Sequence, residues 1–206
     1  MKDNQEARKN QDRAIQDIQT IKAFLEQGQR KLEDSGFHFI FWGLLIPIGF
    51  IVFSFLAPRL GYDAPILRFF WPVLCGTGGI VSFVVGTLSS PRSAHSGYAE
   101  KVSTALWVGN LLAVGILFAA LFLGNGTFSL LFLSMIAVIL GLSYWVYGTV
   151  IQLRWFTLVA LGWWIAALGI SFVGISVAGF ILSAATFVCS FIPGCVLFYS
   201  KKNGRK

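Results

Sequence analysis

The chain has 206 residues, of which 56% are hydrophobic and only 12% are charged. Soluble domains carry roughly 25% charged residues, so this composition excludes a water-soluble fold and predicts an integral membrane protein. The formal net charge of +7 does not indicate a nucleic-acid partner, because the excess lies outside the charged N-terminal segment, in the loops and tail of the apolar part.

Residues 1–36 form a charged arm in which seven basic and seven acidic side chains cancel. Small or apolar residues recur in it with the 3–4 spacing of a heptad repeat, which predicts an amphipathic helix. The heptad positions are Ala7, Gln11, Ala14, Ile18, Ile21, Leu25, Gly28 and Leu32. This seam is weak, because Gln11 and Gly28 occupy two of its core positions.

Two interpretations of the arm stay open. It is either a solvated helix that packs on its own body or on the membrane surface, or a coil that associates with a second copy or another partner. In the second case the contacts are expected at Ile18, Ile21, Leu25 and Leu32. Asp34, Ser35 and Gly36 predict a break between this arm and the membrane part.

Six apolar stretches follow the arm, and each is long enough to cross the ~30 Å hydrocarbon core as a helix. They cover residues 37–56, 69–88, 104–123, 128–149, 155–173 and 176–199, and residues 200–206 form a basic tail. We therefore predict an all-α polytopic membrane protein whose six helices form three consecutive hairpins. The first stretch is too long for the core of a signal peptide, so we expect no cleavable signal.

The basic residues predict the orientation of the chain. With the N-terminus inside, 14 of them face the cytoplasm and only Arg59 and Arg68 face outward. This bias predicts that both termini are cytoplasmic, in a plasma membrane of the bacterial inner-membrane type. The second loop is expected to include Glu100 and Lys101.

Glycines recur at similar places in the three expected hairpins. The odd helices align on Gly49, Gly115 and Gly169, and the even helices on Gly86, Gly148 and Gly194. Small residues let membrane helices approach closely, and Gly78, Ser82 and Gly86 form a ladder of this kind. A threefold internal repeat and a chance recurrence of a common residue both remain open.

The six stretches contain no Asp, Glu, Lys or Arg. Ion-coupled carriers and intramembrane proteases usually need ionisable groups at depth, so we expect neither. Cys75, Cys189 and Cys195 lie in apolar stretches, without the spacing of a metal site or a disulfide framework. We expect no enzymatic activity, no cofactor and no bound metal.

Polar and helix-breaking residues within the stretches are the remaining site candidates. Asn110 lies about 10 Å inside the third stretch, where we expect it to bond across helices or to contact a ligand. Pro47 and Pro193 predict kinks, and the aromatic candidates nearby are Trp42, Trp107, Tyr144 and Trp145. Together they predict a cytoplasm-facing aromatic cavity. An interfacial aromatic belt is the alternative, which we favour for Trp42 and Trp107.

These features favour a non-catalytic membrane protein that acts as an assembly, scaffold or regulatory subunit through its helical arm. We expect the protein to lie in a lipid bilayer. We expect residues 1–34 to bind a second copy of the chain or another protein. The alternative function is a small permease or channel for an uncharged or hydrophobic solute.

Overall fold

The computed structural model describes residues 2–61, 64–89, 98–124 and 129–203, and within these ranges all regular structure is helical. The prediction of an all-α protein is thus confirmed. The elements are α1 (Lys2–Leu60), α2 (Pro65–Ser89), α3 (Tyr98–Leu123), α4 (Leu130–Val150), α5 (Arg154–Ser171), α6 (Ile175–Thr186), the π-helical segment η1 (Phe187–Phe191) and α7 (Ile192–Asn203).

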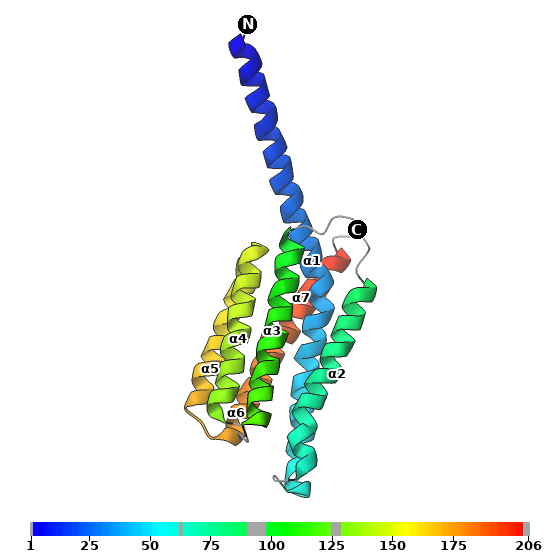
Figure 1. Ribbon diagram of the computed structural model, residues 1–206, viewed down its shortest axis with the longest axis vertical. Coiled ribbons are helices and arrows are strands. Elements are labelled where there is room, and N and C mark those ends of the chain that lie inside the picture. Colours follow the sequence, from blue (N-terminus) through cyan, green and yellow to red (C-terminus); the bar gives the residue numbers. More distant parts are fainter. Residues whose placement is uncertain (1, 62–63, 90–97, 125–128, 204–206) are drawn as a thin grey trace.

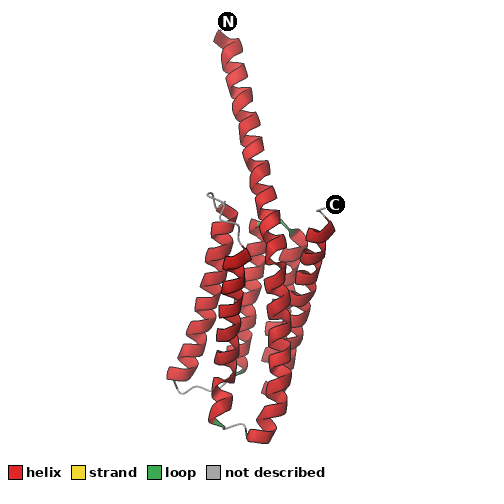
Figure 2. Ribbon diagram, turned by 90° about the vertical axis from the view of Figure 1, so that its right-hand side faces the viewer, coloured by secondary structure: helices red, strands yellow, loops and turns green. Residues whose placement is uncertain are grey.

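Six helical segments in the described residues are long and apolar enough to cross a membrane, as the hydropathy of the sequence predicts. They are Gly36–Leu60, Pro65–Leu88, Lys101–Leu123, Leu130–Val150, Arg154–Ser171 and Ile175–Tyr199. They stand side by side in one bundle, and the N-terminal part of α1 projects beyond it (Figures 1 and 2). The C-terminal end of α7 lies on the same side of the bundle as this projection, which we call the arm side.

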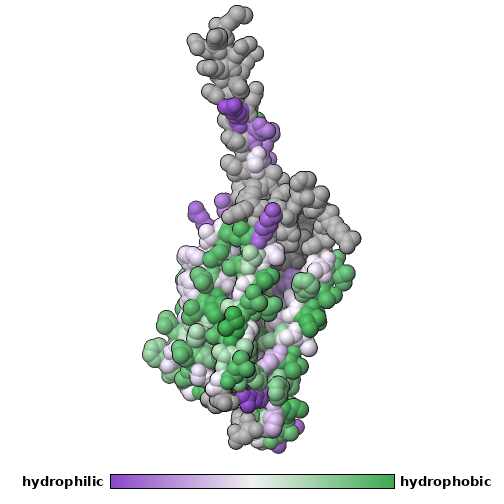
Figure 3. Space-filling model, viewed as in Figure 1, coloured by the Kyte–Doolittle hydropathy of each residue, from purple (hydrophilic) through white to green (hydrophobic). Residues whose placement is uncertain are grey.

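Apolar residues cover most of the bundle on the face drawn in Figure 3. Most of the strongly hydrophilic residues visible there lie on the arm or near the two ends of the bundle. This distribution fits a protein whose middle is surrounded by hydrocarbon.

The predicted break at Asp34–Gly36 is wrong, because α1 continues as one 59-residue helix from the arm into the first span. A glycine inside a helix costs only about 1 kcal/mol, which packing readily offsets. Gly36 is buried, and a methyl group on it would lie 3.2 Å from the carbonyl oxygen of Gly194 in α7. The glycine therefore permits a close helix contact and does not end the helix. The expected loop residues Glu100 and Lys101 are likewise helical, in the first turn of α3.

The first and last helices form one closely packed pair. A methyl group on Gly43 of α1 would lie 2.7 Å from the Cα atom of Phe191, and one on Gly194 would lie 2.7 Å from the backbone nitrogen of Ile40. Only glycine allows two backbones to approach this closely. Gly36 and Gly43 are one heptad apart, so they face the same neighbour along α1.

Helices α4 and α5 form a second closely packed pair, again with glycines at the contact. A methyl group on Gly148 would lie 2.7 Å from the backbone nitrogen of Thr157, and one on Gly141 would overlap the indole of Trp164. The hydroxyl of Ser134 also donates to the carbonyl oxygen of Ala167, at 3.2 Å. These two helices form the most extensive helix–helix contact in the described part of the chain.

The most extensive helix contacts thus are not those within the expected hairpins. Helix α1 packs more extensively on α7 and η1 than on α2, its expected hairpin partner. Helix α4 likewise packs more extensively on α5 than on α3. The aligned glycines also differ in their surroundings. Gly148 and Gly194 contact neighbouring backbones, whereas a methyl group on Gly115 would meet no atom within 4 Å. The internal repeat therefore stays a prediction, and close contact does not explain all of its glycines.

The sixth span changes helix type just before Pro193. The amide of Ile192 donates to the carbonyl of Phe187, five residues back, which is the hydrogen bond of a π-helix. Proline lacks an amide hydrogen and its ring crowds the carbonyl four residues back, which here is Cys189. A wider turn relieves this crowding, so the predicted irregularity takes the form of η1. The other proline, Pro47, lies inside the uninterrupted helix α1.

Candidate functional site: a central cavity

A cavity of about 1700 Å³ lies within the bundle, and we call it the central cavity. Its walls come from α1, α2, α3, α4, α6 and η1, with Trp163 contributed by α5. Along α2 its lining runs from Pro65 to Thr87, which corresponds to about 33 Å of helix. The cavity therefore extends through most of the thickness of a bilayer core.

The cavity exists because α2 and α3 pack lightly on the rest of the bundle. α2 makes its main contacts with α1, and α3 makes its main contacts with α4 and α1. In its most apolar stretch α3 has no buried residue, and α2 has few. These two helices thus form one side of the cavity wall and bury few of their own residues.

The side chain of Phe39 joins several aromatic rings into a cluster beside the cavity. Its ring centroid lies 5.5 Å from those of Trp107 and Tyr144 and 5.3 Å from that of Phe156. Tyr144 in turn stacks on Phe156 at 5.2 Å. Offset and edge-to-face pairs of this kind hold α1, α3, α4 and α5 together and give the cavity an aromatic wall.

Asn110 forms the cross-helix hydrogen bond that its depth in the membrane predicts. The hydroxyl of Ser143 on α4 donates to the side-chain oxygen of Asn110 on α3, at 3.2 Å. Asn110 also lines the cavity, so its amide group is placed where a bound molecule could reach it. The prediction of a bond across helices is confirmed, and ligand contact stays a prediction.

Two further polar pairs line the cavity. The hydroxyls of Tyr144 and Ser190 lie 2.7 Å apart and link α4 to η1. On the arm side, Nδ1 of His38 lies 2.7 Å from the hydroxyl of Ser82. The sequence-predicted ladder of Gly78, Ser82 and Gly86 therefore faces α1, where Gly78 meets Trp42 and Gly86 meets His38.

Trp163 is a buried residue of the cavity wall. Only 1% of its surface is exposed, and its indole nitrogen has no hydrogen-bond partner among the described residues. Trp163 lines the cavity and lies 5.9 Å from the ring of Tyr144. A buried donor without a partner costs about 1–3 kcal/mol, and this nitrogen itself has essentially no accessible surface.

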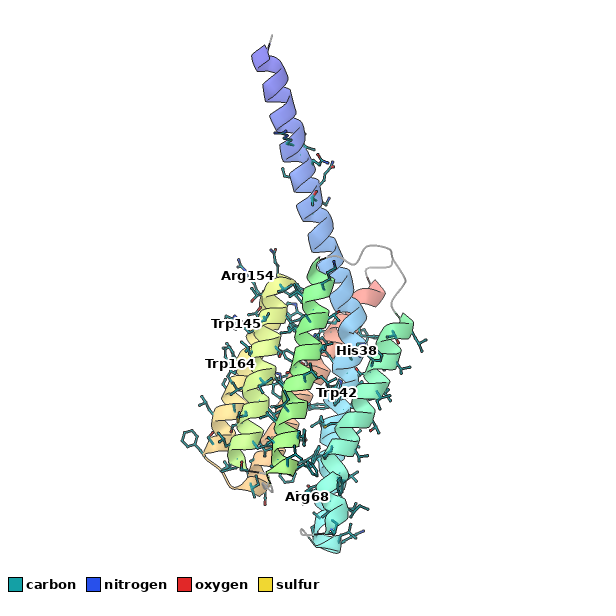
Figure 4. All side chains as sticks on the ribbon, in the orientation of Figure 1. His38, Trp42, Arg68, Trp145, Arg154 and Trp164 are labelled. Carbon is teal, nitrogen blue, oxygen red and sulfur yellow. The ribbon has the colours of Figure 1, made fainter. Side chains whose placement is uncertain are left out.

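At the end of the cavity opposite the arm side, Arg68 of α2 contacts Phe122 of α3. The guanidinium of Arg68 donates to the carbonyl oxygen of Phe122 at 3.2 Å and lies 5.2 Å from the centre of its ring. Arg68 lies near this end of α2 in Figure 4. Among the described residues it is the only Lys, Arg, Asp or Glu that lines the cavity.

The structure divides the predicted cavity candidates into two groups. Trp42, Trp107, Asn110 and Tyr144 line the cavity, whereas Pro47, Trp145 and Pro193 do not. The interfacial aromatic belt, favoured above for Trp42 and Trp107, stays a prediction, because lining the cavity does not fix their depth in a membrane.

Trp145 belongs to the outer surface. It is 41% exposed and stacks on Trp164 with ring centroids 5.6 Å apart. Figure 4 shows both residues at the outer edge of the bundle, whereas Trp42 and His38 lie on α1.

For the arm, the structure describes the helical backbone and a few side chains. Ile18 is 64% exposed, as expected for a helix that projects into solvent. The side chains of Ile21, Leu25 and Leu32 lie outside the described residues, so their contacts stay predictions.

Sequence reasoning missed the contributions of Phe39, Trp163 and Ser190. All three lie in apolar stretches, where the sequence does not distinguish a residue that faces lipid from one that faces the interior.

The cavity itself supplies apolar and aromatic surface with a few hydrogen-bonding groups, which suits the binding of a hydrophobic molecule. No group of His, Cys, Asp and Glu suited to a metal ion occurs among the described residues.

We find no match to this chain among protein-family models, among curated proteins or among solved structures.

Proposed function

We propose that this protein is a non-catalytic membrane subunit that takes part in assembly or regulation, and that its N-terminal arm is the segment which other polypeptides contact. The observation that supports this proposal is the continuity of α1 from Lys2 to Leu60. Residues 2–35 of that helix would span about 50 Å beyond the bundle. A partner held by the arm is therefore connected through a stiff helix to the membrane part.

The inner part of the same helix reaches the centre of the bundle. It packs on η1 and α7 and contributes His38, Phe39 and Trp42 to the cavity wall. Any displacement of the arm thus acts on residues that shape the cavity. This connection is the physical basis for a regulatory role.

The exposed face of the arm carries apolar side chains that a partner would cover. Ile15 is 47% exposed and Ile18 is 64% exposed. Ile18 belongs to the heptad positions, so the arm of a second copy of this chain is the partner we expect first.

Co-purification of two differently tagged copies tests this proposal. Deleting residues 1–33 should abolish co-purification, and Ile18→Lys should weaken it. Gln16→Lys is the matched control, because Gln16 is also exposed but lies on the opposite face of the same helical turn. Co-purification that survives the deletion, or equal loss in both point variants, would contradict the proposed role of the arm.

The central cavity favours a second candidate function, the passage of an uncharged or hydrophobic solute. Solute flux into proteoliposomes should fall in Asn110→Leu, which alters the cavity wall, and in Pro193→Ala, which alters the helix beside it. Trp145→Leu, on the outer surface, should leave the flux unchanged. Equal flux in all three variants and the parent protein would exclude this function.

We propose further that the arm side faces the cytoplasm of a cell whose plasma membrane resembles a bacterial inner membrane. The support is the excess of Lys and Arg on that side, which is the usual determinant of orientation.

A further inference from the structure

Arg68 places a positive charge in the cavity wall at the depth where lipid head groups lie. It is the fourth residue of α2 and of the span that α2 forms, so it lies within about 5 Å of the end of that span. The end of a span corresponds to the boundary between hydrocarbon and head groups. The other titratable histidine, lysine or arginine of the described lining is His38, which lies at the arm-side end.

The guanidinium of Arg68 has hydrogen-bond donors to spare. Of its five N–H groups, one on Nη2 donates to the carbonyl oxygen of Phe122. Phe122 lines the cavity as Arg68 does, so their contact lies at the margin of the cavity. Arg68 is exposed and contacts no carboxylate among the described residues, and Asp63, the nearest acidic residue in the sequence, lies outside them. An anion can therefore approach the remaining donors.

The wall beyond Arg68 suits a hydrocarbon chain. Along α2 the lining continues from Phe69 to Thr87, about 29 Å of helix from Arg68, and it is mainly aliphatic and aromatic. The volume of about 1700 Å³ exceeds the roughly 300–1000 Å³ that is usual for small-molecule pockets. A chain that starts at a head group on Arg68 would thus run toward the middle of the membrane, as lipid chains do.

The remaining polar groups of the wall restrict where a charge can lie. The hydroxyls of Tyr144 and Ser190 bond to each other, and the side-chain oxygen of Asn110 accepts from Ser143. No Asp or Glu lines the cavity in the described part of the chain, so a cationic ligand has no opposite charge there. Burying an unpaired charge is costly, which favours a ligand whose one charged group is negative and stays at Arg68.

We propose that the central cavity binds an anionic amphiphile, whose acidic head group accepts hydrogen bonds from the guanidinium of Arg68 and whose hydrocarbon chain lies along the cavity. A carboxylate or phosphate matches the planar fork of donors of an arginine. This inference deepens the second candidate function, because it names the class of hydrophobic solute. It rests on that function only for what happens to the ligand after binding.

Binding to the full-length purified protein in a non-ionic detergent tests the proposal. The probe is tritium-labelled palmitate at about pH 9, where a carboxylic acid is ionised. Hexadecanol is the matched probe, because it has the same number of carbon atoms and no charge. Palmitate should bind about tenfold more tightly, which is the scale of a charge-assisted hydrogen bond. Equal affinities, or no saturable binding of palmitate, would overturn the proposal.

Two variants locate the head group. Arg68→Gln should weaken palmitate binding about tenfold and change hexadecanol binding little. Arg59→Gln is the control, because Arg59 in the last turn of α1 is also exposed but does not line the cavity. Equal losses of palmitate binding in both variants would mean a general attraction of anions to this end of the protein. Equal losses of palmitate and hexadecanol in Arg68→Gln would mean a structural role, and either result would overturn the assignment of Arg68.

A second pair of variants locates the hydrocarbon chain. Ser183 on α6 lines the cavity, whereas the adjacent Ala184 is exposed and does not. Ser183→Phe adds bulk within the cavity and should weaken binding of both probes about tenfold. Ala184→Phe should leave both affinities unchanged. Unchanged binding in Ser183→Phe, or equal losses in the two variants, would show that the chain does not lie in the cavity.

Competition distinguishes the two sources of such a ligand. Phosphatidic acid with two palmitoyl chains identifies a membrane phospholipid as the ligand if it displaces labelled palmitate at lower concentration than unlabelled palmitate does. Weaker displacement identifies a free fatty acid, and both results support the proposal. Equal displacement by uncharged dipalmitoylglycerol would overturn it. If palmitate binds as expected but no solute flux is measured, the binding site stands and the transport function fails.

Discussion

Replacing Gly43 by alanine tests the close contact between the first and last helices. The added methyl group would lie 2.7 Å from the Cα and Cβ atoms of Phe191, whereas ordinary contact begins near 3.4 Å. The neighbouring atom is backbone, so it cannot rotate away. The backbone nitrogen of Phe191 would lie nearer still, so helix α1 and segment η1 must separate by at least about 0.7 Å, the difference between these two distances.

A gap of this size lowers the stability of an extended interface. A separation of 0.5–1 Å loses roughly a quarter to a half of the dispersion energy between facing atoms. Overpacking of this kind typically costs about 1–3 kcal/mol. The higher helix propensity of alanine returns at most about 1 kcal/mol. Because the obstructing atoms are backbone, the overpacking cost should lie at the upper end of this range, which leaves a net loss of about 2 kcal/mol in Gly43→Ala.

Gly115→Ala is the matched control, because a methyl group there meets no atom within 4 Å. Its stability should be unchanged or up to about 1 kcal/mol higher. The two variants should thus differ by about 2–3 kcal/mol, or about 4–12 °C in melting temperature. Thermal melting in detergent followed by size-exclusion chromatography measures this difference. Equal melting temperatures would refute the backbone contact between α1 and η1.

Tyr144→Phe should lower stability by about 1–2 kcal/mol in the same assay, because the buried hydroxyl of Ser190 loses its partner, whereas Tyr199→Phe, at a position 66% exposed, should have no effect. No difference between these two variants would argue against the hydrogen bond. Arg68→Ala should remove the contact with Phe122 and speed amide hydrogen exchange in the first half of α2 about fivefold, as measured by mass spectrometry. Unchanged exchange would mean that Arg68 does not hold α2 to α3.

Features that depend on local sequence were predictable. The six spans follow from apolar length alone. The bond of Asn110 to Ser143 follows from the cost of burying an amide in hydrocarbon without a partner. The irregular turn before Pro193 follows from the missing amide hydrogen of proline.

Features that depend on which helices meet could not be predicted. Gly36 resembles a helix break in the sequence, but its packing against Gly194, more than 150 positions later, makes it part of a helix contact. Trp163 and Trp164 are adjacent and identical, yet one is buried and the other stacks on the outer surface. Lipid and protein interior both favour apolar residues, so hydropathy does not distinguish the two faces of a membrane helix.

The arrangement of six crossings with both chain ends on one side is the basis of everything above, and labelling of single cysteines tests it most directly. In a chain with Cys75, Cys189 and Cys195 replaced by alanine, single cysteines are introduced at the exposed positions Gln11, Arg59, Arg154 and Gly174. Intact cells are treated with a maleimide that cannot cross the membrane. The account predicts that the cysteines at 59 and 174 react, and that those at 11 and 154 react only after the membrane is opened. Labelling of the cysteines at 11 and 59 from the same side of the membrane, or of those at 11 and 154 from opposite sides, would contradict it.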